Sequence, residues 1–312
     1  MIRFLRHAEI DKLSWDKCIR NAVNGIIYAR SWYLDIVCPG WNALVEDDYS
    51  SVFPLTSGRK LTIRYLYQPF FTQQLGLFTT NHLTEALVER FLHEIPSEYK
   101  YAEIHLNSMN KVNPGNLLAE TAVNLELDLI EAYENLKKNY DQNTKRNLKK
   151  ATERMMAIER NVKPDELITL FRENFGHREG ILKRGDYQRL RTLIDHCMKN
   201  TVSMITGVRG DDGALHAGIF FLHDGARWIL HFAASDKVAK ERGMMFLLID
   251  NFIGEHAEKA VTLDFEGSND PNVARFYKGF GARNCNYTRI TLNRLPMVIR
   301  KVLKIKKQLR KR

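Results

Sequence analysis

Alternating and periodic apolar residues predict a chain that mixes short strands with helices. Alternation over about four to eight residues is typical of a strand with one buried face, and apolar residues three or four positions apart are typical of a helix. By these patterns the first half contains helices at 10–23 and 82–95 and strands at 42–45, 51–55, 61–67, 101–106 and 125–130. The polar, helix-prone residues 131–160 predict one long helix that connects the two halves.

The last third has the clearest pattern, in which turn residues separate three strand-like runs. We expect helices at 165–174 and 186–199, then strands at 202–208, 215–222 and 227–234, an apolar helix at 243–258, a buried strand at 261–265, a short helix at 272–278 and a strand at 283–292. This order predicts a half-open mixed sheet. Because the first half has a looser version of the same order, we expect a duplicated domain, divided as 1–160, 161–294 and a tail at 295–312.

Composition places the chain among ordinary globular proteins, since 44% of its 312 residues are hydrophobic and 27% are charged. The net charge of +10 is concentrated at one end, because eight Lys or Arg and no acidic residue lie between Arg300 and Arg312. Apolar residues interrupt these cations at helical spacing, at Val298, Val302, Leu303, Ile305 and Leu309. The tail is therefore either a basic amphipathic helix for an anionic membrane surface or RNA, or a terminal helix packed on the body.

Cysteine usage and hydropathy exclude several classes of protein. The four cysteines are far apart and form no CxxC pair, which argues against a zinc ribbon or a thioredoxin-like motif. No window of about 18 apolar residues is present, and the N-terminus lacks the apolar run of a signal peptide. We expect a cytoplasmic protein without a metal site, or a peripheral one at the inner face of the membrane.

The most informative segments are residues 263–268 (LDFEGS) and 272–282 (NVARFYKGFGA). They resemble the end of a GNAT acyltransferase domain, and more particularly the Fem-type and BioF-type acyltransferases, which pair two GNAT-like domains in one chain. Residues 31–35, 52–55, 68–69 and 145–151 are similar to the same family. The resemblance implies an α+β fold of two tandem GNAT-like domains with mixed central sheets.

The resemblance also implies catalytic residues. The tyrosine of the family's Phe-Tyr pair lies near the thioester sulfur as a general acid, a role that falls on Tyr277; the alternative is a half-buried aromatic that holds its helix. Fem-type ligases instead have a lysine at this point, and here Lys278 comes one residue later, which turns its side chain by about 100°. Lys278 is then either a substrate contact or a solvated surface lysine.

Acidic and basic groups near these motifs are candidates for the base. Asp264 and Glu266 alternate on one strand end and should share a face, where a carboxylate could hold or deprotonate an acceptor amine. We take Asp264 as a substrate contact and Glu266 as a base, with His231 as a rival because histidine titrates near neutrality. Each could equally be a hydrogen-bonded residue of the sheet.

A donor-binding loop is implied by the same resemblance. GNAT domains bind the pyrophosphate of coenzyme A at Arg/Gln-x-x-Gly-x-Gly/Ala before a helix, where backbone N–H groups suit phosphate oxygens. The corresponding residues here are Lys240, Arg242, Gly243, Met244 and Met245, with Met245 in place of the second small residue. Acyl-CoA is thus the implied co-substrate, and a plain helix-starting loop is the alternative.

Three functions remain open at this stage. The first is an N-acyltransferase that moves an acyl group from acyl-CoA to an amine-bearing acceptor, such as a cell-wall or envelope metabolite. In that case the aromatic residues Tyr67 and Phe70 are candidates for an acceptor cleft between the halves, or else for core packing. The second is an aminoacyl-tRNA-dependent ligase acting on a peptidoglycan precursor, and the third is a non-catalytic binding module at the membrane surface.

Overall fold

The computed structural model describes residues 1–113, 118–153, 156–175, 182–267 and 270–297, which form two compact units. Unit 1 contains residues 1–122 and the chain from 287 onward, and unit 2 contains residues 123–286. The boundary therefore lies at residue 122, where the sequence analysis expects it at 160. The reason is that β9 (Leu125–Asp128) pairs with β14 (Thr262–Asp264) in the sheet of unit 2.

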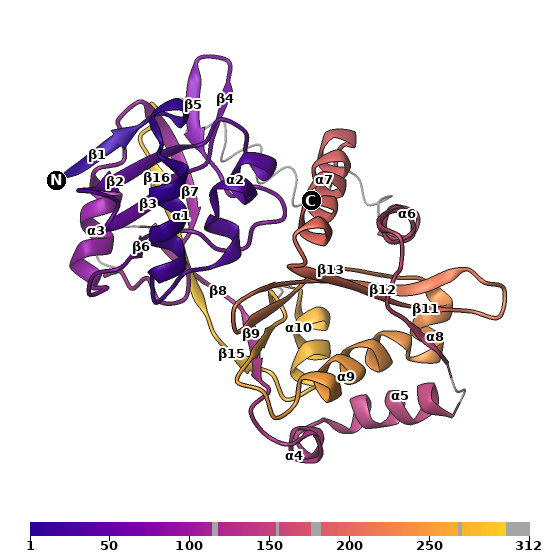
Figure 1. Cartoon of the computed structure of the whole chain (residues 1–312). Helices are drawn as coiled ribbons and strands as arrows, with labels where there is room; N and C mark the ends of the chain where they lie inside the picture. Colours follow the sequence, from indigo (N-terminus) through magenta and orange to yellow (C-terminus); the bar gives the residue numbers. More distant parts are fainter. Residues whose placement is uncertain (114–117, 154–155, 176–181, 268–269, 298–312) are drawn as a thin grey trace. The chain divides into compact units, whose positions relative to one another are not determined.

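The described residues of unit 1 form two sheets and three α-helices (Figure 1). An antiparallel sheet has the order β1 (Ile2–Leu5), β2 (Asn42–Glu46), β3 (Ser51–Leu55) and β6 (Phe78–Thr79). A second sheet has the order β4 (Ser57–Lys60), β5 (Ile63–Leu66), β7 (Tyr99–His105), β16 (Tyr287–Asn293) and β8 (Leu118–Ala122). The helices are α1 (Lys12–Asn21), α2 (Ser31–Val37) and α3 (Glu85–His93). One core cluster joins α3 to both sheets, through buried residues such as Phe53, Phe91, Tyr99 and Ile290.

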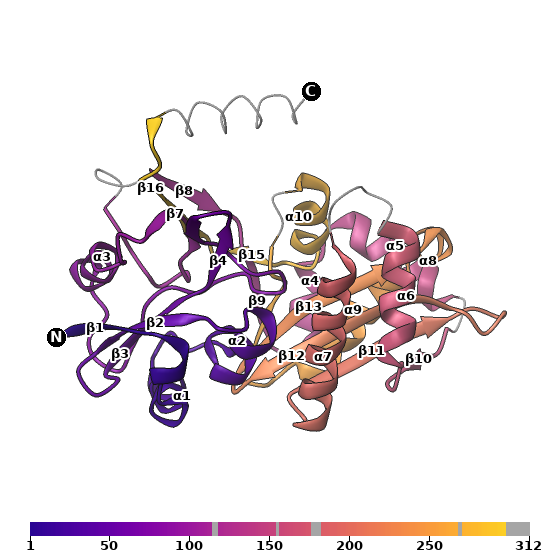
Figure 2. The ribbon, with the colours of Figure 1, turned by 90° about the horizontal axis from the view of Figure 1, so that it is seen from above.

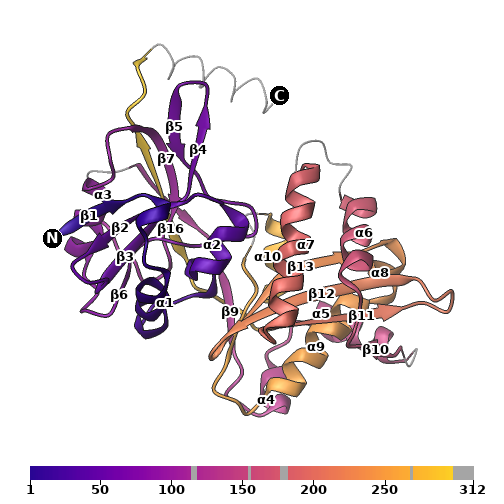
Figure 3. The same ribbon diagram turned by 45° about the horizontal axis from the view of Figure 1, so that its top comes forward.

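Unit 2 has one seven-stranded sheet between two layers of helices (Figure 3). The strand order is β10 (Ile158–Glu159), β11 (Ser203–Arg209), β12 (Leu215–Asp224), β13 (Arg227–Ser235), β14, β9 and β15 (Arg283–Asn284). The meander β11–β12–β13 is antiparallel, as the sequence predicts, and β14 is parallel to β13. One face carries α6 (Pro164–Phe175) and α7 (Arg184–Lys199); the other carries α8 (Lys237–Arg242), α9 (Met244–His256) and, packed on α9, α5 (Gln142–Thr152).

Two predictions about single elements are wrong. The long helix expected at 131–160 is broken into α4 (Tyr133–Lys138) and α5, because the Asp141 side chain caps α5 by accepting a 2.7 Å hydrogen bond from the N–H of Thr144. The strand expected at 283–292 is divided between the units, since β15 pairs with β9 whereas β16 lies between β7 and β8 (Figure 2). A run of alternating residues does not reveal which sheet it joins.

The described part of the chain ends at residue 297, near the start of the predicted tail. Leu295 is buried, and residues 298–312 lie outside the described part of the chain, so the predicted amphipathic helix stays a prediction. Within the described ranges, no helix is both long and apolar enough to cross a bilayer.

Candidate active site

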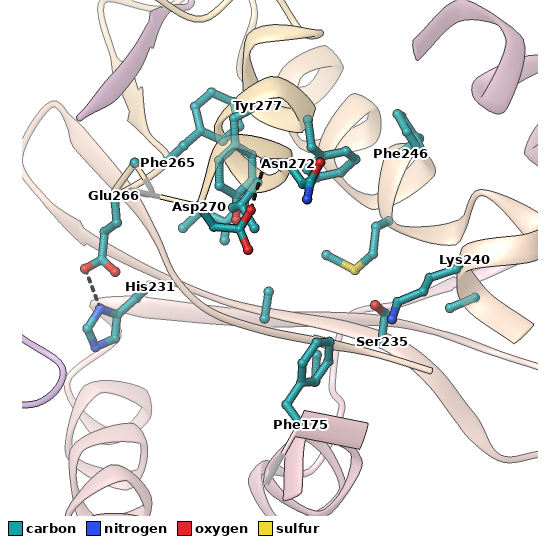
Figure 4. A pocket seen from close by; sticks show the side chains of 18 of the residues that line it. Phe175, His231, Ser235, Lys240, Phe246, Phe265, Glu266, Asp270, Asn272 and Tyr277 are labelled. Carbon is teal, nitrogen blue, oxygen red and sulfur yellow. Dashed lines mark hydrogen bonds and ion pairs between the residues drawn. The ribbon is translucent and has the colours of Figure 1, made fainter. Parts of the chain in front are cut away.

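The candidate site lies where two parallel strands of unit 2 separate. β13 and β14 pair from Arg227 opposite Thr262 to Ile229 opposite Asp264, and β14 then ends while β13 continues to Ser235. Among the described residues, the β13–β14 pairing thus stops at Ile229, and residues 230–235 of β13 extend beyond it. A cavity of about 690 Å³ lies here, and Leu230, His231, Ala233, Ala234 and Ser235 all line it (Figure 4).

A β-bulge turns His231 toward the end of β14. Phe220 of β12 pairs with Phe232, but the next residue, Phe221, pairs with Leu230, so His231 is the extra residue of β13. Bulges redirect a side chain relative to the regular alternation of a strand. The His231 side chain is fully buried, and its Nδ1 lies 2.9 Å from Oε1 of Glu266 (Figure 4).

Glu266 is held in an uncommon backbone conformation. Its φ of 55° lies in the left-handed region, and its N–H donates a 2.8 Å hydrogen bond to Oδ1 of Asp264. Gly267 follows with a φ of 43°, and a Cβ at this position would lie 2.4 Å from the carbonyl oxygen of Val123, so only glycine fits. The Glu266 side chain is 22% exposed and lines the cavity. Of the two hydrogen-bonded side chains, His231 is fully buried and Glu266 is partly exposed to the cavity.

Tyr277 reaches the same cavity from α10 (Pro271–Lys278). Asp270 caps this helix by accepting a 2.8 Å hydrogen bond from the N–H of Asn272, and proline opens its first turn. The Tyr277 ring stacks on Phe265 with ring centroids 4.8 Å apart. Burial, followed by the nearby charge of Glu266, raises the pKa of Tyr277, so the phenol stays protonated at neutral pH.

The other end of the cavity is the junction between α8 and α9. Gly243, with a φ of 73°, both ends α8 and precedes α9, and no side chain caps the start of α9. The N-terminus of a helix carries partial positive charge and favours anions. Lys240 adds a full positive charge at this end, with its Nζ 5.1 Å from the centroid of the Phe175 ring.

The cavity gathers some of the residues that the sequence singles out. Those that line it are Tyr277, Glu266, His231, Lys240, Gly243 and Met245. Met244 is completely buried in the core, and Arg242 lines a separate hollow with Arg209 and Asp211. Their assignment to donor binding therefore has no support from this geometry.

The predicted substrate contacts lie elsewhere. Asp264 is 1% exposed and is absent from the cavity lining, because its carboxylate pairs with Arg227 inside the sheet. Lys278 is exposed and is also absent from the lining. Tyr67 and Phe70 belong to unit 1, and their role in an acceptor site stays a prediction.

Several lining residues were missed by the sequence analysis: Phe175, Ser235, Phe246, Asp270 and Asn272. The Asp-Pro pair at 270–271 is a recognisable helix start and could have been found. Phe175 carries no such signal, because it lies in another helix, nearly 100 residues before α10.

The comparisons with known proteins establish the fold. No protein-family model matches the chain, and no curated protein matches it significantly. The crystal structure of FemX is similar with a TM-score of 0.63 at 13% identity, over 92% of this chain and 96% of that chain. A conserved protein of unknown function from Bacteroides thetaiotaomicron is similar with a TM-score of 0.57 at 12% identity, over 93% and 99%.

A third similar structure comes from Agrobacterium fabrum. It is the C-terminal domain of a protein described as a lysylphosphatidylglycerol synthetase, with a TM-score of 0.54 at 11% identity, over 90% of each chain. Identities this low establish fold and not activity. The chain has the α+β, tandem GNAT-like fold of the Fem type, as the resemblance in its sequence implies.

Proposed function

We propose that unit 2 is the centre of an N-acyltransferase, which moves an acyl group from an activated donor to an amine. The observation that carries this proposal is the meeting, in one cavity, of a partly exposed carboxylate, Glu266, and a protonated phenol, Tyr277. A base and an acid whose protonation states differ at neutral pH are what acyl transfer to an amine requires.

In the proposed reaction the acceptor arrives as an ammonium ion and gives a proton to Glu266. The free amine attacks the acyl carbonyl, and the C–N bond forms as the carbonyl oxygen becomes negative. N–H groups of β13 beyond its last pair with β14, Ile229 with Asp264, would stabilise that oxygen. When the bond to the leaving group breaks, Tyr277 protonates the leaving thiolate. The second proton of the new amide nitrogen then restores the Tyr277 phenol, and Glu266 releases the first proton to water, so that one proton is released overall.

Acyl-CoA is the donor that fits the other end of the cavity. Lys240 and the start of α9 supply positive charge for the phosphates of coenzyme A, and the edge of β13 supplies hydrogen-bonding groups for the amides of its pantetheine arm. Met245 lines this end of the cavity, at the position where the family motif has a small residue.

An aminoacyl-tRNA-dependent ligase is the alternative, because an ester donor would use the same base and acid. The specific observation in its favour is α5, where Arg146, Lys149 and Lys150 are exposed and point away from the buried Leu148. Clustered cations of this kind suit RNA phosphates. A cell-wall precursor is the acceptor that the resemblance implies in either case.

Calorimetric titration with acetyl-CoA and with charged tRNA tests the proposal, followed by mass spectrometry of an amine acceptor incubated with the bound donor. Binding of acetyl-CoA that Lys240→Ala weakens, together with amide formation, supports the acyltransferase. Binding of charged tRNA with a steep salt dependence supports the ligase instead. Failure of both donors to bind overturns the catalytic proposal and favours the binding module.

A further inference from the structure

A buried ion network lies beneath the end of β14. The Arg227 Nη1 atom is 2.7 Å from Oε1 of Glu126 and 2.7 Å from Oδ2 of Asp264. The side chain of Asp264 is 1% exposed, whereas those of Glu126 and Arg227 are 18% and 32% exposed, so Asp264 is the member that is shielded from water. Removing one member of a buried ion pair is strongly destabilising, because it leaves an uncompensated charge. The network therefore fixes the position of the Asp264 carboxyl group.

The second oxygen of Asp264 acts on the neighbouring backbone. Oδ1 of Asp264 accepts the N–H of Glu266, two residues further along the chain, at 2.8 Å. An aspartate that bonds the backbone two residues ahead forms an Asx turn, which specifies the local chain direction. The turn stabilises Glu266 at a φ of 55°, a left-handed conformation that costs any residue except glycine about 1–2 kcal/mol.

This conformation decides where the Glu266 carboxylate lies. After β14, an extended residue 266 would continue the strand and follow its alternation. The left-handed turn instead carries the side chain to the bulge residue His231, 2.9 Å away, and to the cavity. Gly267, which also has positive φ, completes the turn against the backbone of Val123.

We propose that Asp264 is a positioning residue. Arg227 holds the Asp264 carboxyl group in place, and the hydrogen bond from the Glu266 N–H to this group fixes where the Glu266 carboxylate lies. Asp264 does not line the cavity, and its effect on the reaction passes entirely through the residue two positions later. The role in catalysis rests on the proposed function, in which Glu266 is the base. The role in positioning does not, since it concerns the hydrogen bond between Glu266 and His231.

The positioning role can be tested by nitrogen NMR of histidine-labelled protein, without substrate. At a pH of about 8.5 an ordinary imidazole is neutral, and a ring nitrogen that faces a carboxylate must carry the proton. In the native protein His231 should therefore be the Nδ1–H tautomer. Glu266→Ala, which removes every acceptor of this side chain, gives the spectrum of the released ring. The signal of His231 is assigned by its loss in His231→Asn.

The test variant is Asp264→Asn, which keeps the side-chain shape but places an amide against Arg227. We expect the ratio of Nδ1–H to Nε2–H tautomer at His231 to fall at least threefold. Asp128→Asn is the matched control, because Asp128 also accepts a hydrogen bond from a side chain of β14, Thr262, and pairs with an arginine, Arg283. An unchanged tautomer ratio in a folded Asp264→Asn protein overturns the proposal. Should that variant fail to fold, Arg227→Gln removes the cation that holds Asp264, and an unchanged tautomer ratio in that variant also overturns the proposal.

The catalytic part is tested by a double-mutant cycle on kcat/KM. If Asp264 acts through Glu266, the double variant Asp264→Asn/Glu266→Gln is no slower than Glu266→Gln alone. Additive losses overturn the route through Glu266. Absence of any transferase activity would refute the proposed function while leaving the tautomer result to decide the positioning role.

Discussion

Replacing Gly243 by alanine should destabilise unit 2 by more than the same replacement at Gly213. The two glycines have nearly the same backbone, with φ values of 73° and 74°. A Cβ at Gly213, in the hairpin between β11 and β12, would have no atom within 4 Å, whereas one at Gly243 would lie 2.7 Å from the carbonyl oxygen of Asn147. The pair therefore separates the cost of the left-handed conformation from the cost of a backbone collision.

The expected magnitudes follow from these contacts. A left-handed alanine costs about 1–2 kcal/mol, partly offset by about 0.4–1 kcal/mol because alanine restricts the unfolded chain, so Gly213→Ala should cost about 1 kcal/mol. At Gly243 the collision involves the backbone of α5, which cannot move aside by rotating a side chain. Overpacking of this kind adds about 1–3 kcal/mol, for a total of about 3 kcal/mol.

Urea unfolding followed by far-ultraviolet circular dichroism measures both losses. The midpoint of Gly243→Ala should fall about three times as far as that of Gly213→Ala, with the slopes unchanged. Equal losses would show that α5 is free to move away from the start of α9. The packing between α5 and the α8–α9 junction described above would then be incorrect.

Three further results are expected. Tyr277→Phe should lower kcat by about ten- to a thousandfold with little change in stability, since the ring can still stack on Phe265, whereas the exposed Lys278→Ala should be nearly silent; the reverse outcome would favour the ligase. Truncation after Arg300 should change Tm little but weaken binding to anionic vesicles or RNA, as the removed residues are mostly basic; a large drop in Tm would place the tail in the core. Burial raises the pKa of Asp264 from 3.8 to about 6, so the folded protein binds this proton more tightly than the unfolded chain does. The free energy of unfolding should therefore fall by about 2 kcal/mol as pH rises from about 4 to about 6. Urea titrations at a series of pH values measure this slope, and Asp264→Asn should flatten it.

Local patterns predicted much of the fold and little of the long-range pairing. The strands expected at 51–55 and 215–222 form β3 and β12, because alternation and turn residues act over a few positions. The break before α5 was missed because a single capping residue, Asp141, outweighs helix-prone neighbours. The pairing of residues 287–293 with β7 and β8 depends on contacts about 170–190 residues away in the chain, which periodicity cannot reveal.

The sequence also predicted only part of the candidate site. Motif resemblance singled out Tyr277, and acid–base chemistry singled out Glu266 and His231; the structure brings all three into one cavity. Alternation put Asp264 and Glu266 on the same face, but the positive φ of Glu266 breaks that alternation and sends the two carboxylates to different partners. A backbone conformation that an ordinary residue adopts only under constraint has no signature in its own sequence.

The position of β16 constrains how the protein can be made. During synthesis residues 1–122 leave the ribosome long before residues 287–293, yet the second sheet of unit 1 lacks an interior strand until that last segment arrives. Unit 2 can fold first, from residues that are contiguous in the chain. The nascent N-terminal segment meanwhile exposes the edges of β7 and β8 that β16 later covers, and open strand edges of this kind are prone to pair with other chains. Expression of residues 1–122 alone should therefore yield aggregates, which a co-expressed segment containing β16 should reduce.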